Sequence, residues 1–336
     1  MHTSTDLSVI IVNYRGWERL SQCLDSLYNI ADDRFSFEVI VVDNYSNDWL
    51  VPKFKKLYPR FTFVVNSDNL GFANGCNLGA SISRGSNLLF LNPDTIVNAE
   101  AIFLMLTEIR QRNSYSIVSC RQVKANGTLE RPYGKFLSIF TLTGWLRAFN
   151  KMFGGSKLKP FVQNDNYIYP DWVSGSVVMI SRLSFKNLGG WDEDFWMYFE
   201  DVDLCYRARV KGGEVVKLKN AVIQHNHGGA SRINPKVTAL TKTEVNISRH
   251  VYISKHQTSF VAVYMHTFLI LNNLLFGLIP AVAGAVFIYS KSLNSRCMAY
   301  FQLILYYYNV LTTGTWLSKR SVHYPEQAKY SSILTN

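Results

Sequence analysis

The sequence predicts an α/β fold built on a mostly parallel sheet, followed by a hydrophobic helical region. Two β-branched runs, residues 8–12 and 37–42, each end in polar residues, and apolar residues recur at helical spacing between them. This order predicts a β-α-β unit. Farther along, residues 259–290 and 297–318 contain no Asp, Glu, Lys or Arg over 32 and 22 positions. Either stretch could cross a hydrocarbon core, which takes roughly 20 residues.

Each further element follows from a local pattern. The first helix is predicted from the spacing of Leu20, Cys23, Leu24 and Leu27. Additional strands are predicted at 61–66, 88–91, 172–180, 214–218 and 221–224, with helices at 73–83 and 204–210. Residues 121–171 show no sustained period and are expected to form a long irregular connection, which in a compact domain is usually functional. In parallel sheets of this kind the ligand lies beyond the carboxyl ends of the strands.

Composition narrows the class of protein. The 336 residues are 48% hydrophobic with a formal net charge of +11, a globular composition. Residues 1–203 hold 20 Lys/Arg against 21 Asp/Glu, whereas residues 204–336 hold 15 against 3. Nucleic-acid binding is therefore a distant alternative, because the basic excess is absent from the sheet and lies beside apolar stretches. The five scattered cysteines form no Cys-x-x-Cys pair, and together with a first apolar run too short for a signal peptide they favour a cytosolic catalytic part.

These patterns divide the chain into four regions. We expect a catalytic domain at 1–235, a basic connecting segment at 236–258, membrane-associated helices at 259–318 and a polar tail at 319–336. Because the first apolar stretch contains His266, Asn272, Asn273 and Pro280, a span, a kinked hairpin and an in-plane segment all remain open, as does a buried helical subdomain. Basic residues flank both stretches, as expected near anionic lipid, but on every side, so they do not settle a topology.

Residues 191–207 interleave carboxylates with aromatic rings. Carboxylates can accept hydrogen bonds from sugar hydroxyls, and rings offer apolar faces to the C–H side of a pyranose. At a helix start, terminal N–H groups would also keep Asp201 or Asp203 ionised. The alternative is a surface helix start rich in acids, although surface acids rarely accompany so many large rings.

Asn92-Pro93-Asp94 follows a predicted strand and places a carboxylate at the sheet's carboxyl edge. A hard divalent cation bridging two phosphates prefers one or two carboxylates, so Asp94 suits that role, although such a tripeptide alone is more often a turn. Asp43 and His225 also end predicted strands, and an imidazole could be a second metal ligand or a purely structural side chain. No Gly-x-Gly-x-x-Gly follows the first strand and no P-loop motif occurs, which disfavours a dinucleotide-dependent oxidoreductase and a nucleotide hydrolase.

Seven motifs occur in one order and together resemble a known family. They are Val-Ile-Ile-Val-Asn-Tyr, Val-Val-Asp-Asn-x-Ser, Asn-x-Gly-Phe-Ala-x-x-x-Asn, Leu-Asn-Pro-Asp, Trp-x-Ser-Gly, Phe-x-Met-Tyr-x-Glu-Asp-x-Asp-Leu-Cys-x-Arg and His-x-x-Gly-Gly-x-Ser. The chain thereby resembles, over about residues 7–232, the inverting family-2 glycosyltransferases with the GT-A fold. The likeness is greatest to bacterial rhamnosyltransferases of O-antigen and other cell-surface polysaccharide biosynthesis.

This resemblance implies a role for each matching residue. Asp201 would be the general base that takes the proton of the acceptor hydroxyl. Asp94 and His225 would bind Mg²⁺ or Mn²⁺ on the donor diphosphate. Nucleotide-sugar binding would involve Asn13, Tyr14, Asp43, Asn44, Asn69, Gly71, Phe72 and Asn92. The acceptor side would be lined by Trp172, Trp191, Asp192 and Glu200.

The resemblance also implies the reaction and its partners. A nucleotide-diphosphate sugar, most simply dTDP-L-rhamnose, would donate its sugar with inversion to a lipid-linked saccharide at the cytoplasmic face of a bacterial inner membrane. The chain departs from the family pattern at the metal motif, which is Asn-Pro-Asp rather than Asp-x-Asp and offers a single carboxylate. The alternatives are another nucleotide-sugar donor, or a membrane-anchored saccharide-binding module that kept the fold without transfer.

Overall fold

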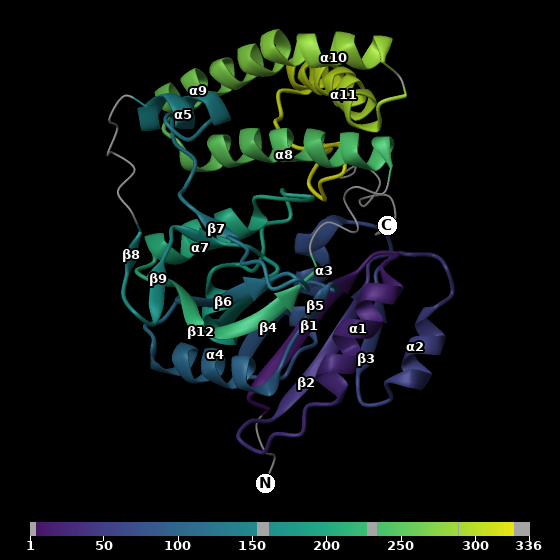
Figure 1. Ribbon diagram of the computed structural model, residues 1–336, viewed down its shortest axis with the longest axis vertical. Coiled ribbons are helices and arrows are strands. Elements are labelled where there is room, and N and C mark those ends of the chain that lie inside the picture. The colour runs from purple at the N-terminus through teal and green to yellow at the C-terminus, as the bar shows by residue number, and fades with distance from the viewer. Residues whose placement is uncertain (1–4, 153–160, 227–233, 288, 326–336) are drawn as a thin grey trace. The chain divides into compact units, whose positions relative to one another are not determined.

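The computed structural model describes residues 5–152, 161–226, 234–287 and 289–325 (Figure 1). The chain divides into two compact units, each formed by several segments. The first, called the sheet unit, comprises Met1–Phe136, Pro160–Asp192 and Glu200–His227. The second, called the helical unit, comprises Leu137–Lys159, Glu193–Phe199 and Gly228–Asn336.

The sheet unit is a mixed sheet with helices on its faces. Its strands are β1 (Leu7–Asn13), β2 (Phe37–Asp43), β3 (Thr62–Val65), β4 (Asn87–Leu91), β5 (Thr95–Ile96), β6 (Ile117–Val123), β7 (Tyr133–Gly134), β8 (Val162–Gln163), β9 (Tyr167–Tyr169), β10 (Trp172–Val173), β11 (Val177–Ser181) and β12 (Val215–His225). Its helices are α1 (Trp17–Tyr28), α2 (Val51–Leu57), α3 (Gly71–Ser81), α4 (Ala99–Gln111), α6 (Arg182–Asn187) and α7 (Glu200–Val210). The main sheet runs β3-β2-β1-β4-β11-β6-β12-β9-β8, and β5 pairs with β12.

The first four strands confirm the predicted parallel sheet. β1 pairs in parallel with both β2 and β4, and every residue of β1 is buried. α1 buries Leu20, Cys23, Leu24 and Leu27, the stripe whose spacing predicted it. Because β1, β2 and β4 are covered on both faces, they are continuous apolar runs rather than alternating ones. Their carboxyl ends therefore place Asn13, Asp43 and Asn92 along one edge of the sheet.

Two parts of the sheet differ from expectation. The single strand expected at 172–180 is broken: β10 pairs with β7 in a small separate sheet, and β11 enters the main sheet antiparallel to β4. A Cβ on Gly175, between them, would lie 3.3 Å from the Phe72 ring and 3.6 Å from the Asp201 Cβ, so a side chain there would press on the Phe72 ring. The two short strands expected at 214–218 and 221–224 are instead one strand, β12, whose pairing with β6 shifts register between Lys217 and Val222.

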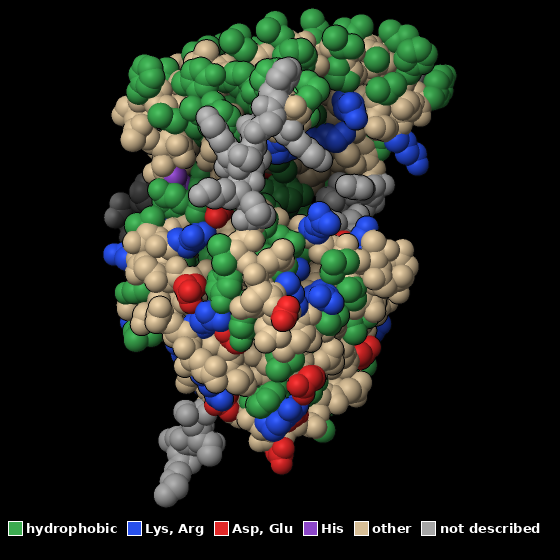
Figure 2. Space-filling model, turned by 60° about the vertical axis from the view of Figure 1, so that its left-hand side comes forward, with side chains coloured by type: hydrophobic (Ala, Val, Ile, Leu, Met, Phe, Trp, Pro, Cys, Tyr) green, Lys and Arg blue, Asp and Glu red, His purple; other side chains and the backbone are tan. Residues whose placement is uncertain are grey.

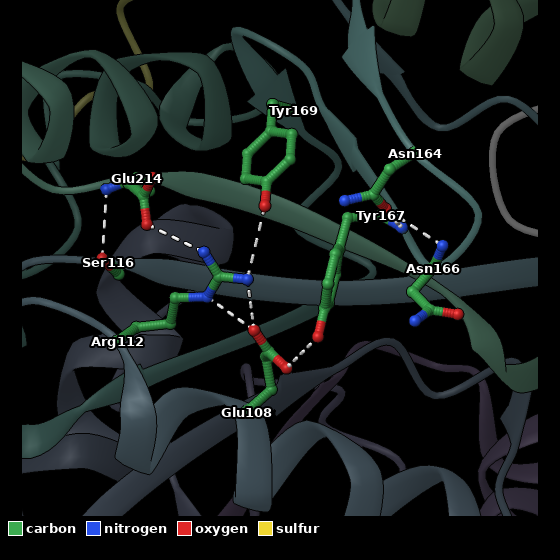
Figure 3. Close-up of polar contacts among 8 residues, drawn as sticks. All are labelled: Glu108, Arg112, Ser116, Asn164, Asn166, Tyr167, Tyr169 and Glu214. Carbon is green, nitrogen blue, oxygen red and sulfur yellow. Dashed lines mark hydrogen bonds and ion pairs between the residues drawn. The ribbon is translucent and has the colours of Figure 1, made fainter.

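A polar cluster joins the far strands of this unit to α4 (Figure 3). Arg112 donates to Glu108 on α4 and, at 2.9 Å, to Glu214 just before β12. The Tyr167 hydroxyl of β9 donates to the other Glu108 oxygen at 3.1 Å. Both members of the Arg112–Glu108 pair are mostly buried, with 16% and 11% of their side chains exposed, so solvent screens the pair only weakly.

We expect Arg112→Ala to destabilise the sheet unit without altering its chemistry. The change leaves the Glu108 carboxylate with only the Tyr167 hydroxyl, and losing hydrogen bonds to a charged group costs about 1.5–3 kcal/mol. Chemical denaturation of Arg112→Ala measures this loss. Arg34→Ala, which removes an exposed guanidinium that pairs with Asp32 and Glu100, is the control and should cost less than Arg112→Ala does. Equal losses in the two variants would contradict the structural role of the cluster.

The helical unit consists of α5 (Gly144–Met152), α8 (Pro235–His256), α9 (Ser259–Leu271), the π-helix η1 (Asn272–Phe276), α10 (Gly277–Val286) and α11 (Lys291–Thr313). The segment predicted as a basic connection is thus mostly the long helix α8. Its buried positions include Thr243, Glu244, Ser248 and His250, so apolar periodicity did not reveal it. α11 packs against both α8 and α10. Among the described residues, one continuous helix, Ser259–Val286, is long and apolar enough to cross a membrane by length and composition.

Candidate active site

The loops after β1 and β2 are tied together at the sheet's carboxyl edge. Asn13 and Asp43 pair in register, and the Asn13 amide donates to the Asp43 carboxylate at 3.4 Å. Asp43 also accepts the Ser46 backbone N–H at 3.0 Å. Four non-glycine residues in these loops have positive φ: Arg15, Tyr45, Asn47 and Trp49. Backbone strain of this kind concentrates at ligand-binding loops.

Asn44 connects the same edge to the start of α3. Its amide donates to the Asn69 side chain and to the Gly71 carbonyl, both at 3.0 Å. Gly71 itself has a φ of 92°, which favours glycine. The residues predicted to bind the nucleotide sugar are thus gathered in part: Asn13, Asp43 and Asn44 are buried and organise the loops, whereas Tyr14 is 45% exposed. Their contacts with a nucleotide stay a prediction.

The structure brings Asp94 and His225 together from positions far apart in the sequence. β5 pairs with the end of β12, with Thr95 opposite His225. This pairing places the Asp94 Oδ1 atom 3.2 Å from the His225 Nε2 atom, and both side chains are largely buried. The turn after β4 and the histidine at the end of β12 therefore form one site. Each of them taken alone could have been purely structural.

Glu130 completes this cluster and was not predicted. Its Oε2 atom lies 3.2 Å from the His225 Nδ1 atom, on the other side of the ring from Asp94. The backbone holds it there, since the Glu130 N–H donates to the Gln122 carbonyl of β6 at 2.9 Å. A single glutamate in an aperiodic stretch carries no sequence pattern, so only the fold could reveal it. A carboxylate on one ring nitrogen fixes the orientation in which the other nitrogen faces a ligand.

The residues present fit a divalent cation with few protein ligands. Asp94 offers a carboxylate and His225 an imidazole nitrogen that face each other, a donor set suited to Mg²⁺ or Mn²⁺ only if oxygens of a diphosphate or water complete the shell. Within the described ranges, no group of three or more His, Cys, Asp or Glu side chains is arranged to hold a metal ion. The described residues therefore supply no further carboxylate ligand in place of the one that the Asn-Pro-Asp motif lacks.

Asp201 lies in the first turn of α7, where two backbone groups fix its carboxylate. The Gly175 N–H donates to Oδ2 at 2.9 Å and the Val202 N–H donates to Oδ1 at 2.8 Å. Burial raises the pKa of Asp201, and these hydrogen bonds partly offset the rise. The residues just before the helix, Tyr198 and Phe199, have positive φ, a second strained segment.

The neighbouring carboxylates differ from Asp201 in environment. Burial raises the pKa of Glu200 well above its usual value, and repulsion by Asp201 and Asp203 adds to the rise. Asp203 is fully buried and pairs with Arg207, 2.6 Å away. Of the three carboxylates, Asp201 combines a raised pKa with a position fixed by backbone N–H donors, the pattern expected of a general base.

The Asn92-Pro93-Asp94 turn and Asp201 are linked through consecutive residues. Gly175 donates its N–H to Asp201, and the Ser176 carbonyl accepts the Asn92 N–H at 3.0 Å. The break between β10 and β11 therefore contacts both Asp201 and the start of the Asn-Pro-Asp turn. The sequence predicted both chemical groups but not the element that joins them.

The residues predicted on the acceptor side divide into two kinds. Trp172 is half-buried and donates its indole N–H to the Lys135 carbonyl at 2.9 Å. Trp191 is only 1% exposed and packs edge-on against Phe72 and Phe90 in the core. We expected this ring to line the acceptor side. It lies in the core instead, where the rings of Phe72, Phe90 and Phe185 enclose it. Asp192 follows the positive-φ glycines Gly189 and Gly190, and Glu200, which is buried, follows Tyr198 and Phe199.

The last motif of the sequence is described only in part. His225 ends β12 as predicted. The glycines Gly228 and Gly229 of His-x-x-Gly-Gly-x-Ser lie outside the described residues.

Comparisons with known proteins agree with this geometry. The chain is 32% identical over 210 residues to the low-salt glycan biosynthesis hexosyltransferase Agl10 of Haloferax volcanii, covering 61% of this chain and 62% of that protein. It is 25% identical over 215 residues to the rhamnosyltransferase WbbL of Escherichia coli, covering 61% and 77%. It is also 25% identical over 255 residues to an N-acetylglucosaminyl-diphospho-decaprenol L-rhamnosyltransferase of Mycobacterium tuberculosis, covering 68% and 78%. The chain thus spans less than two thirds of the length of Agl10.

Solved structures show the same fold at low identity. GalNAc-T7 crystallised with UDP, GalNAc and Mn²⁺ aligns with a TM-score of 0.53 and 16% identity, over 74% of this chain and 50% of that one. TarS of S. aureus aligns with a TM-score of 0.50 and 15% identity, over 78% and 41%. This likeness confirms the predicted GT-A fold. Residues 8–171 match the family described as Glycosyl transferase family 2, and the chain accordingly carries a domain of that family.

Proposed function

We propose that this chain is an inverting glycosyltransferase that moves L-rhamnose from dTDP-L-rhamnose onto a lipid-linked saccharide in cell-surface polysaccharide synthesis. One observation carries the proposal: the Gly175-Ser176 segment contacts both the fixed Asp201 carboxylate and the turn that bears Asp94. The names of two relatives, both rhamnosyltransferases, support the sugar, and the decaprenol in one name supports the lipid.

The proposed chemistry follows from this arrangement. Asp201 accepts the proton of the acceptor hydroxyl as that oxygen attacks the anomeric carbon of the donor. Asp94 and His225 would hold Mg²⁺ or Mn²⁺, and a cation bound there would supply positive charge against the negative charge of the departing diphosphate. Glu130 keeps the His225 ring oriented through its Nδ1 atom. The acceptor oxygen displaces the diphosphate in a single step with no covalent intermediate, so the configuration of the anomeric carbon is inverted.

A panel of nucleotide sugars tests the proposal. The purified chain is incubated with dTDP-L-rhamnose and with UDP-, GDP- and other dTDP-sugars, in the presence of Mn²⁺ and a prenyl-diphospho-saccharide, and nucleoside diphosphate release is measured. Release from dTDP-L-rhamnose alone is the expected result. Release from another donor would replace the sugar but keep the reaction class. Saccharide binding with no release from any donor would favour the non-catalytic binding module.

We further propose that the helical unit attaches to the cytoplasmic face of the membrane in plane, without crossing it. Figure 2 shows hydrophobic side chains gathered over the helices of this unit. Large exposed apolar residues include Phe260, Leu271, Phe276, Ile279 and Val286 on the α9-to-α10 segment and Leu305 and Leu311 on α11. Such a face suits burial at the headgroup and acyl boundary.

The polar contacts beneath this face favour attachment over a span. Lys242 of α8 donates to the Ser295 hydroxyl of α11 at 3.0 Å, and Glu244 of α8 pairs with Arg320. Because α11 packs between α8 and α10, a span by α9 and α10 would carry these charged groups toward the hydrocarbon. Ionised side chains at that depth are costly.

We expect the double change Phe260→Glu and Ile279→Glu to release the protein from vesicles that contain anionic lipid. These side chains are 87% and 73% exposed, and removing them from the acyl boundary should lower partitioning about tenfold or more. Vesicle flotation measures the effect, with Leu183→Glu as a control, because Leu183 is 70% exposed on the sheet unit. Unchanged flotation would exclude this face, and resistance of the wild type to alkaline carbonate would indicate a span instead.

A further inference from the structure

Two arginines of the helical unit, Arg147 on α5 and Arg249 on α8, have no acidic partner. Among the described residues, neither forms an ion pair. Arg147 donates to the Thr141 carbonyl at 3.0 Å, and Arg249 donates to the Asn246 side chain at 3.3 Å. The Arg249 Nε atom is shielded from solvent and has no hydrogen-bond partner.

Arg147 and Arg249 lie on neighbouring helices, because Leu146 of α5 packs against the hydrophobic cluster that contains Ile253 of α8. Burial lowers the pKa of Arg249, and the positive charge of Arg147 lowers it further. Two cations held close together without an anion destabilise a fold, and a partly buried arginine normally has its donors paired. An anion that contacts both would relieve both costs.

Two of the described acids of the helical unit, Glu244 and Asp194, are already paired with other cations. Glu244 is bound by Ser318 and Arg320. Asp194 is bound by Lys255 and His323. Residues 204–336 carry 15 Lys/Arg against only 3 Asp/Glu, so the balance of charge in this part of the chain also favours an anion from outside.

Polar side chains around Arg249 form a preorganised network. The Asn246 oxygen that accepts from Arg249 also accepts from Asn273 at 3.4 Å, and Asn273 donates to the Tyr307 hydroxyl at 2.8 Å. Asn273 lies in the π-helix η1, a rare conformation that occurs often at functional sites. The network connects α8, η1 and α11 beside the arginine.

An apolar surface adjoins this network, because Asn272, which Trp145 contacts, donates to Asn273 at 3.3 Å. Trp145 of α5 donates to the Asn272 side chain at 2.9 Å and packs against the Phe268 and Phe276 rings at 5.4 and 6.2 Å. Phe149, 54% exposed, lies one turn along the same face of α5. A ligand that reaches the arginines here would be anionic at one end and hydrocarbon at the other. Tryptophan at such a boundary is typical of the membrane interface.

We propose that Arg147 and Arg249 bind the diphosphate of a prenyl-linked acceptor saccharide. Two guanidinium groups match the two negative charges of a diphosphate that links a lipid to a sugar, whereas a phospholipid phosphodiester carries one. Each planar guanidinium can bind a phosphate through two parallel N–H donors. This site rests on the proposed function, because it names how the lipid-linked acceptor is held, but it lies entirely within the helical unit.

Binding of farnesyl diphosphate to the full chain in detergent tests the site. Arg249→Gln should weaken binding about tenfold to a hundredfold, because it removes charge-assisted hydrogen bonds at a partly buried position. Arg249→Lys keeps the positive charge but loses the paired N–H donors of the guanidinium, so its affinity for farnesyl diphosphate should be intermediate. Arg147→Gln, at an exposed position, should weaken binding less and cannot perturb the core.

Arg296→Gln is the matched control, since Arg296 is exposed on α11 and its loss removes the same charge. It should bind farnesyl diphosphate as the wild type does. Phosphatidylglycerol in mixed micelles and inorganic diphosphate distinguish the sources of phosphate, and both should compete poorly. Effective competition by phosphatidylglycerol would overturn the assignment in favour of a phospholipid headgroup site. If Arg296→Gln weakened farnesyl diphosphate binding as much as Arg249→Gln does, binding would reflect only the general positive charge of this unit.

The same variants separate this site from the proposed reaction. Binding of dTDP-L-rhamnose to the sheet unit should be unchanged in Arg249→Gln. If the wild type transfers sugar but Arg249→Gln and Arg147→Gln both bind farnesyl diphosphate normally, the site is wrong and the proposed function stands. If binding depends on Arg249 but no nucleotide sugar is turned over, the proposed function is wrong and the site stands.

Discussion

Asp201→Asn should lower sugar transfer by about 10²–10⁴ while leaving donor binding nearly intact. The substitution keeps the size of the side chain and an oxygen that can accept the Gly175 or Val202 N–H, so the start of α7 should persist. It removes the only feature a base needs, an ionisable oxygen. Single-turnover transfer from dTDP-L-rhamnose, together with donor titration, measures both quantities.

The pH profile of the wild type gives a second readout of the same residue. Burial raises the pKa of Asp201, and a base acts only when ionised, so kcat/KM should fall as the pH drops through this raised pKa. In Asp201→Asn the residual activity should lose that limb. A profile that is unchanged in the variant would place the titrating base elsewhere.

Glu200→Gln is the matched control, because it changes the adjacent carboxylate in the same way. Glu200 is buried, and burial raises its pKa well above its usual value, so its uncharged form is favoured over a wider pH range than that of an exposed glutamate. The variant should therefore transfer sugar within a few-fold of the wild type. If Glu200→Gln or Asp203→Asn abolished transfer and Asp201→Asn retained it, the base would be wrongly assigned.

The sequence predicted the strands of the sheet and the candidate site residues Asp94 and His225 better than it predicted the side chains around them. β1, β2 and β4 are buried on both faces, so their apolar runs are plain in the sequence. Asp94 and His225 were expected to meet because both end strands of one sheet, and the Thr95–His225 pairing brings them together. The carboxyl ends of parallel strands share one edge of a sheet whatever the intervening chain does, so this inference needs only the strands.

What the sequence did not predict depends on long-range packing. Glu130 reaches His225 only because Leu129 bridges to Val123 at the end of β6, a contact with no local signature. Trp191 was expected to face a sugar, yet composition cannot tell an exposed ring from one enclosed by Phe72, Phe90 and Phe185. In α8 the polar side chains of Thr243, Glu244, Ser248 and His250 are buried among the apolar ones, so the apolar periodicity that reveals a helix is obscured.

Asp94→Ala should lower turnover about 10²-fold or more and remove its dependence on added Mg²⁺ or Mn²⁺. The variant deletes the sole carboxylate of the Asn-Pro-Asp turn and leaves His225 facing only Glu130 within this cluster. Binding of Mn²⁺ in the presence of dTDP, followed by electron paramagnetic resonance, gives a readout that does not depend on turnover. Asp94→Asn, which keeps the shape without the charge, should lose most of the same binding.

Asp165→Ala is the control for this change, because it removes an equal charge at an exposed position between β8 and β9. It should bind Mn²⁺ and turn over as the wild type does. A chelator should abolish wild-type activity, and added Mn²⁺ should restore it. Full wild-type activity in excess chelator would contradict the metal role of Asp94, since the charge on the departing diphosphate would then have to be neutralised by His225 and nearby cationic side chains alone.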